Sequence, residues 1–225
     1  MDALWLSIRL AFCVAVILLL FGTPLACWIS RTRWRGKFLI ESVVALPLVL
    51  PPTVLGFYVL LTLGSNGPIG KLWQSWFGHP LAFTFSGLVI ASVFYSLPFA
   101  VQPMVTAFES VDSRLTDAAA VLGAGSFRMF WRIVLPLSVP GVITAAVLSF
   151  AHTLGEFGVV LMVGGNIPGV TRTVSIDIYD HVQSLEVDAA NRMALALLFI
   201  SFAVLSSIYA VNRRVWSPWL VKHGD

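Results

Sequence analysis

The sequence predicts an all-α polytopic membrane protein with about five transmembrane helices. Of its 225 residues, 58% are hydrophobic and only 11% are charged, and the mean hydropathy is +0.88. A soluble domain is far less apolar than this. The apolar residues fall into five stretches, each long enough to cross a hydrocarbon core about 30 Å thick. We expect a single domain, residues 1–225, because no repeat or linker marks a second.

The first expected span covers residues 5–29 and contains Arg9 as its only charge. A cleaved signal peptide is the alternative, but the basic segment before it is weak and a basic stop at residues 31–37 follows at once. We therefore expect a mature helix. Cys13 and Cys27 both fall on it, so they cannot form a disulfide with each other.

Prolines mark the next two spans. Residues 38–63 contain Pro47, Pro51 and Pro52, which remove backbone donors and should kink or break the helix. The third span is expected at residues 81–107, which contain Pro98 and Pro103. The remaining two spans are expected at residues 139–162 and 194–211.

Basic residues predict the orientation in the membrane, because lysine and arginine are enriched in cytoplasmic segments. Four lie on one side: Arg9, Lys71, Arg172 and Arg192. Ten lie on the other: Arg31, Arg33, Arg35, Lys37, Arg114, Arg128, Arg132, Arg213, Arg214 and Lys222. The count places residues 108–136 in the cytoplasm, the N-terminus outside and the C-terminus inside. Tryptophans near the span ends agree with headgroup-level anchoring: Trp5, Trp28, Trp34, Trp131 and Trp216.

The cytoplasmic segment, residues 108–136, should contain a short amphipathic helix. Asp112 or Ser113 can cap its start, and Gly123 and Gly125 should end it in a left-handed backbone. Ser126 can cap the next helix, which runs toward Pro136. Four residues share the apolar face of the first helix: Leu115, Ala118, Ala119 and Leu122. Such a face needs a partner surface, and a loop resting on the bilayer is the simpler alternative.

Two outer loops connect the spans. Residues 64–80 contain Gly70-Lys71, but the glycine spacing is wrong for a phosphate loop and no Ser or Thr follows the lysine. Residues 164–192 can form an amphipathic helix with Val174, Ile178 and His181 or Val182 on one side. That helix would lie on the outer surface or dip back into the protein, and a solvated connection is the alternative.

The fourth span carries a stripe of small residues, which lets two transmembrane backbones approach closely. Its members recur at every fourth position: Gly141, Ala145, Ser149 and Thr153. His152 and Glu156 lie one turn apart near the outer end. Ionisable groups at this depth usually face a bundle interior or a watery path. We expect a satisfied pair that lines, with the stripe, a pathway or a subunit contact. A metal pair lacks a third ligand, and a proton relay is the other alternative.

A motif in the cytoplasmic segment resembles the EAA loop of ABC-importer permeases, whose pattern is E-A-A, three residues, G, nine residues, I-x-L-P. The matching residues are Asp117, Ala118, Ala119, Gly123, Ile133, Leu135 and Pro136. Asp117 departs from the family's glutamate by one methylene. Further matches, LPLVLPPTVLG at 46–56, GPIGKLW at 67–73 and LGEFG at 154–158, extend the likeness over nearly the whole chain. Together they resemble the molybdate ABC-transporter permeases, with sulfate and tungstate permeases as near relatives.

This resemblance implies a type I importer fold that pairs with a second copy about a two-fold axis, in the inner (plasma) membrane. It implies that the EAA helix docks on a cytoplasmic ABC ATPase and that a periplasmic binding protein delivers molybdate or a related tetrahedral oxyanion. The coupling residues would then be Asp117, Ala118, Ala119, Leu122, Gly123, Ile133, Leu135 and Pro136. We expect no cofactor on this chain, with ATP and Mg²⁺ used by the ATPase, because the chain has no Walker sequence.

Other function classes make different demands. A proton-coupled secondary transporter would depend on His152 and Glu156 and would often show internal repeats. An intramembrane enzyme needs a facing nucleophile and base, and the sequence offers no such constellation. A nucleic-acid partner is not expected, because the net charge is only +3 and no lysine-arginine block occurs.

Overall fold

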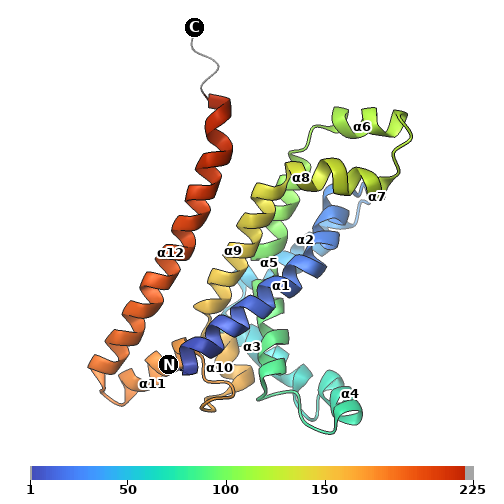
Figure 1. Cartoon of the computed structure of the whole chain (residues 1–225). Helices are drawn as coiled ribbons and strands as arrows, with labels where there is room; N and C mark the ends of the chain where they lie inside the picture. The colour runs from blue at the N-terminus through green and yellow to red at the C-terminus, as the bar shows by residue number, and fades with distance from the viewer. Residues whose placement is uncertain (1, 221–225) are drawn as a thin grey trace.

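The protein is a helical bundle built around α1 (Asp2–Arg31), α5 (Phe85–Glu109) and α9 (Val139–Leu154), which pack against one another (Figure 1). The computed structural model describes residues 2–220, without the side chains of residues 208, 209 and 211–220. The core between these helices consists of fully buried apolar side chains, among them Leu10, Leu18, Leu88, Val101 and Met104. The first expected span is therefore an integral part of the bundle, and both of its cysteines are free and half-buried.

The second expected span is broken, as its prolines predict. α2 (Lys37–Val49) ends before Pro51, α3 (Pro52–Leu63) begins with Pro52, and the two axes are bent by 115°. Pro52 occupies the first turn of α3, where a missing N–H costs nothing. In Figure 1 the pair still leads from one end of the bundle to the other.

Within residues 2–220, three helices are long and apolar enough to cross a membrane, or up to five if each bent pair counts as one span. The three are α1, α5 and α12 (Val187–Leu220), whose apolar part is Val187–Ser207. α12 begins seven residues before the expected start at Ala194. It contacts α9 and α11 (Val174–Gln183) and otherwise stands away from the bundle (Figure 1).

The expected loops lie at opposite ends of the bundle (Figure 1). The N-terminus, α4 (Pro68–Phe77), α10 (Gly158–Gly164) and α11 lie at one end. The other end carries α6 (Ser113–Val121), α7 (Ser126–Met129), the π-helical turn η1 (Phe130–Val134) and α8 (Leu135–Leu137). Seven of the ten basic residues belong to this second end. The side chains of Arg213 and Arg214, and all of Lys222, lie outside the described residues, and the cytoplasmic placement of the α6 end stays a prediction.

The fourth expected span, residues 139–162, is wrong at its outer end. α9 stops at Leu154, and α10 is a separate helix that packs on α3. At the other end, residues 126–137 form a nearly continuous helix bent by 73° from α9. Pro136 cannot donate a hydrogen bond and its ring crowds the carbonyl four residues earlier, which explains the widened π-turn before it.

The two segments expected to be outer loops contain one helix that was expected and one that was not. α11 forms as expected, but its buried residues are Val174, Ile176 and Asp177, whereas Val182 is 54% exposed. Its first turn dips into the protein, where the Val174 N–H donates to Ser7 Oγ at 2.8 Å. α4 was missed, although Pro68 after its first cap and left-handed Gly78 after its last residue are ordinary helix boundaries.

Candidate functional site

α6 is a capped helix without a core of its own. Asp112 caps its start, where Oδ1 accepts from the Arg114 N–H at 2.9 Å. Gly123 ends it with φ +78, the Ala124 N–H donates to Ala119 O, and the Gly123 N–H donates to Ala120 O. This pattern is a Schellman ending. No residue of α6 is buried.

Two details of this ending differ from expectation. Gly125 has φ −68, so it is not left-handed, and it precedes α7 as the residue before the first turn. Ser126 is the first residue of α7 and makes no capping hydrogen bond. Gly123 alone therefore supplies the left-handed turn, and Gly125 supplies an extended backbone that starts the next helix.

The expected coupling residues form two groups. Asp117, Ala118, Ala119, Leu122 and Gly123 lie on α6 and its cap, and Leu122 is 87% exposed. Ile133, Leu135 and Pro136 lie on the helix of residues 126–137, which leads into α9. Within the part of the chain that the structure describes, Asp117 makes no ion pair. The motif therefore joins an exposed helix to a segment anchored in the bundle.

That anchor rests on α5. The Ser138 hydroxyl donates to Ala107 O at 3.1 Å, at the bend between α8 and α9. Phe130 lies edge-on to Phe108 with ring centroids 5.9 Å apart, and Val134 is buried. A force on residues 126–137 would thus be transmitted to both α5 and α9.

The small-residue stripe packs within the chain. A Cβ on Gly141 would collide with Ala107 Cβ of α5, and Ala145, Ser149 and Thr153 are buried. The close helix approach predicted by the stripe is confirmed. Thr153 also lies within hydrogen-bonding distance of Ser96 of α5, with their hydroxyl oxygens 2.8 Å apart. A role of the stripe in a pathway or a subunit contact stays a prediction.

His152 lies in an aromatic and hydroxyl cluster near the C-terminal end of α9. Its ring stacks on Phe99 with centroids 3.9 Å apart and lies 4.8 Å from the ring of Tyr95. Ser96 Oγ lies 3.0 Å from His152 Nδ1 and 2.8 Å from Thr153 Oγ1, both within hydrogen-bonding distance. The imidazole is thus held in one orientation by its neighbours from α5.

Glu156 is satisfied, but not by His152. α9 has already ended, and Glu156 Oε1 accepts from the Val159 N–H in the first turn of α10 at 2.8 Å. The carboxylate is buried and stabilises the start of α10, where the free N–H groups favour an acceptor. The expected His152–Glu156 pair is therefore corrected to two neighbouring groups with separate partners.

Both residues line one cavity of about 620 Å³ between α3, α5, α9 and α10. Pro52, Thr53 and Tyr95 line it as well. α10 packs closely on α3 at two glycines, one on each helix. A Cβ on Gly158 of α10 would clash with Pro52 of α3, and a Cβ on Gly56 of α3 would clash with Met162 of α10. The cavity brings together donors from Thr53, Tyr95 and His152. Sequence reasoning missed Thr53 and Tyr95, although the proline pair before Thr53 marks the break that exposes it.

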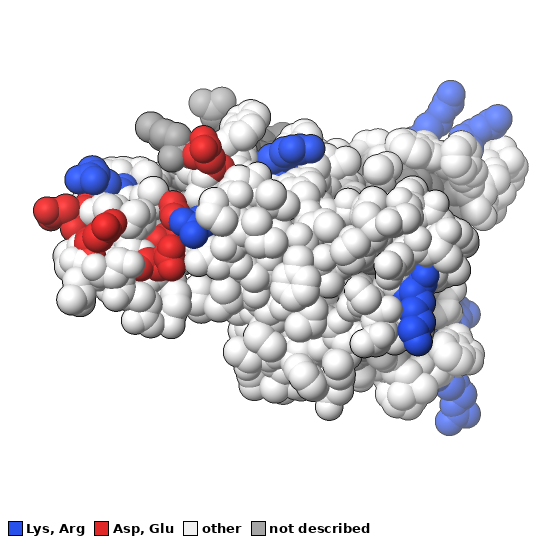
Figure 2. Space-filling model, turned by 90° about the horizontal axis from the view of Figure 1, so that it is seen from below, with Lys and Arg blue, Asp and Glu red and all other residues white. Residues whose placement is uncertain are grey.

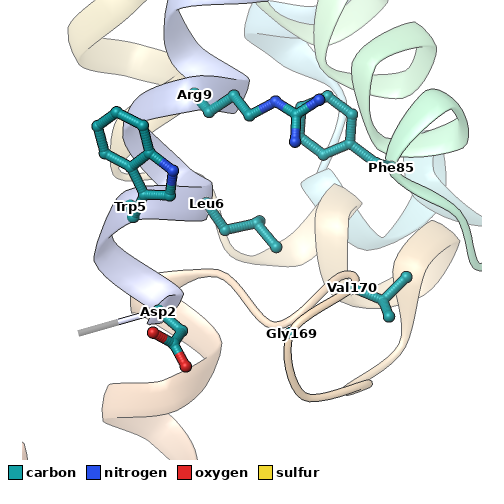
Figure 3. Close-up of a pocket in the computed structure, with 7 residues that line it drawn as sticks. All are labelled: Asp2, Trp5, Leu6, Arg9, Phe85, Gly169 and Val170. Atoms are coloured by element: carbon teal, nitrogen blue, oxygen red, sulfur yellow. The ribbon is translucent and has the colours of Figure 1, made fainter.

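The end of the bundle that carries α4, α10 and α11 has two further features. Arg9 extends over the ring of Phe85 with its guanidinium carbon 4.6 Å from the centroid, beside a cavity of about 410 Å³ also lined by Asp2, Trp5 and Val170 (Figure 3). Figure 2, seen from this end, shows acidic side chains gathered over α11 and the start of α12. There Arg172 pairs with Asp177 and Asp180 at 3.5 and 3.4 Å. These contacts hold the outer loop to α11.

The comparisons with known proteins cover almost the whole chain. The chain is 54% identical to the Molybdenum transport system permease protein ModB of Azotobacter vinelandii over 95% of its own length and 94% of that protein's. It is 38% identical to the protein of the same name from Escherichia coli (strain K12), over 95% and 96% of the two lengths. Among solved structures, a bacterial transporter involved in the import of alginate matches with a TM-score of 0.72 at 19% identity, over 94% of this chain and 79% of that chain.

The fold match extends to the MetNI methionine ABC transporter in an inward-facing conformation, with a TM-score of 0.71 at 14% identity over 95% of this chain and 94% of that chain. At such identities these likenesses establish the fold, which is that of ABC importer permeases. Residues 12–217 match the family described as "Binding-protein-dependent transport system inner membrane component". The chain belongs to this family of transport-system membrane subunits.

Proposed function

We propose that this chain is the permease subunit of an ATP-driven importer that carries molybdate or a related tetrahedral oxyanion across the inner membrane. The observation that carries the proposal is the 54% identity to a molybdenum transport permease over nearly the full length of both chains. Sulfate and tungstate are alternative cargoes, because they share the tetrahedral dianion shape.

Coupling to ATP is proposed to run through α6. A helix outside the bundle with an unburied apolar face is suited to a cleft on another protein. The partner would be a cytoplasmic ABC ATPase, which would bind ATP and Mg²⁺, and this chain would bind neither. Closure of the ATPase would move α6, and residues 126–137 would pass that movement to α5 and α9 through the contacts of Phe130 and Ser138.

The pathway is proposed to include the cavity of His152 and Glu156. A hydroxyl on Thr53, a phenol on Tyr95 and an imidazole on His152 can each donate a hydrogen bond to an oxyanion without a fixed positive charge. Weak, multiple donors suit a cargo that must leave as readily as it enters. The second wall would come from a second copy of the chain, and a periplasmic binding protein would dock at the α4 and α11 end.

The alternative of a proton-coupled carrier rests on Glu156, a buried carboxylate in the cavity wall. Its hydrogen bond to the Val159 N–H gives it a structural role and weakens that alternative. The two functions differ in their energy source, which an experiment can separate.

The test uses proteoliposomes that contain this chain with its ATPase and the binding protein. We expect uptake of radiolabelled molybdate that requires ATP inside and persists when an uncoupler collapses the proton gradient. Sulfate competition at equal concentration measures the selectivity. Uptake that does not depend on ATP and that stops when the uncoupler is added would overturn the importer assignment.

A further inference from the structure

A groove lies at the α6 end of the bundle, between the last turns of α1 and residues 126–142. Its volume is about 990 Å³. The walls are mostly apolar and aromatic, including Leu20, Pro24, Cys27, Phe127, Phe130 and Leu135. None of these residues belongs to the cavity of His152 and Glu156. The groove is therefore a separate surface that the proposed transport path does not use.

One end of this groove is positively charged. Arg31 lines it, together with the polar side chains of Thr32 and Ser126. The two segments that form the walls, residues 19–35 and 126–142, contain no Asp or Glu. Their charged residues are Arg31, Arg33, Arg35, Arg128 and Arg132. In the described part of the chain, none of these arginines forms an ion pair with an acidic side chain.

The polarity of the groove changes along α1. Leu19 and Leu20 lie nearer the bundle centre, whereas Trp28 and Arg31 follow two to three turns later. Trp28 and Trp131 both line the groove, and indole rings settle at the level of lipid headgroups. An apolar channel that ends in an aromatic and then an arginine layer has the same order of polarity as a phospholipid, from acyl chain to phosphate.

We propose that this groove binds an anionic phospholipid, with an acyl chain along α1 and the phosphate at Arg31. Arginine presents a planar fork of donors that matches phosphate geometry, and basic pockets between transmembrane helices are suited to anionic headgroups. The bound lipid braces residues 126–137 against α1, next to the segment that leads to α6. Neither the cargo nor the ATPase enters this argument, so the proposal stands apart from the proposed function.

The first test measures lipid retention by native mass spectrometry of the purified full chain in detergent. Phosphatidylglycerol should be retained in preference to phosphatidylcholine, and Arg31→Gln should weaken that preference about fivefold. Arg9→Gln is the matched control, because it removes the same charge at the opposite end of the same helix. Equal retention of the two lipids by the wild type, or equal effects of the two substitutions, would overturn the proposal.

A second test needs no substitution. Cys27 lines the groove and Cys13 lies elsewhere on α1, and both thiols are half-buried. Phosphatidylglycerol should slow alkylation of Cys27 by N-ethylmaleimide more than phosphatidylcholine does, and Cys13 should respond equally to the two lipids. Protection of Cys27 that appears only with added ATPase, or a Cys27 cross-link between two copies in either lipid, would assign the groove to a protein partner and reject the lipid.

Discussion

Two regions of the molecule use the same small residue types, glycine and alanine, with opposite results. They are packed in the contact of α9 with α5, and they are unburied on the helix α6. Gly141 of α9 lies directly against Ala107 of α5, and Ala145, one turn later, is fully buried. Ala118 and Ala119 of α6, with Gly123 at its end, meet no neighbouring helix that buries them. Small residues allow a second helix to approach closely, but they do not determine whether that helix belongs to the same chain or to another protein. In α9 the partner is internal, and on α6 the open face is available to another protein.

The difference also separates stability from coupling. Substitutions in the α5–α9 contact must disturb the fold, because packed interiors accommodate added volume poorly. Substitutions on α6 change a helix that buries no side chain in the bundle, so they should lower ATP-driven uptake while the bundle stays folded. The predictions below, in order of decreasing effect, test this separation.

The largest effect is expected for Gly141→Leu. The added side chain must enter the space of Ala107 and the Pro103 carbonyl, so we expect a loss of about 1–3 kcal/mol in the free energy of unfolding. Thermal unfolding in detergent measures it. Gly155→Ala is the control, because the nearest atom to the new Cβ is Ala151 O at an ordinary 3.8 Å. Equal melting temperatures for both variants would show that α5 and α9 do not touch there.

Gly123→Val is expected to reduce ATP-driven uptake with little loss of bundle stability. Its φ of +78 strains a β-branched residue by about 1–2 kcal/mol, and a Cβ there meets nothing within 4 Å. Gly123→Asn is the control, since asparagine tolerates a left-handed backbone. Uptake and ATPase co-purification are measured for both variants. Normal uptake with valine would remove α6 from the coupling route.

How far the sequence predicted these regions depends on whether the cause was local. The capped start of α6 and the left-handed Gly123 follow from short-range chemistry, and both are confirmed. The break at Pro51-Pro52 is local too, and it is confirmed by the 115° bend. By contrast, the expectation of a left-handed Gly125 was wrong. Gly125 is the N-cap of α7 and has an extended backbone, because the preceding glycine in the chain, Gly123, already ends α6.

The candidate cavity was harder to predict, because its walls come from segments distant in the chain. The spacing of His152 and Glu156 suggests a pair on one helix, but α9 ends between them at Leu154. Thr53 and Tyr95 carry no local signal that would join them to His152. The stripe of α9 predicted a close helix contact correctly, but its partner, α5, follows only from tertiary packing.

A smaller effect is expected for Asp117→Ala. The carboxylate is exposed and has no ion-pair partner among the described residues, so it is free to meet a basic residue of another chain. An exposed pair contributes about 0.2–1 kcal/mol, which predicts up to about fivefold weaker ATPase binding that fades at high salt. Asp117→Glu should bind normally, since the family pattern has glutamate there. Salt-independent loss with both substitutions would indicate damage to α6 instead of a lost ion pair.

The smallest effect is expected for Glu156→Gln, which tests whether the carboxylate supports α10 or carries protons. Glutamine keeps an oxygen that can accept from the Val159 N–H, so α10 should keep its start and uptake should stay substantial when ATPase and binding protein are present. Glu156→Leu is the contrasting variant. It leaves that N–H without its acceptor at a cost of about 1–3 kcal/mol, which should lower thermal stability.

A proton carrier makes the opposite demand, because glutamine cannot titrate and would abolish uptake as completely as leucine. Uptake by Glu156→Gln in the presence of an uncoupler therefore discriminates between the two roles in one assay. Abolished uptake with a normal melting temperature would show that the charge itself is required. The buried carboxylate would then have a role in transport as well as in stability. The separation between a stabilising core and a coupling surface would not hold at this residue.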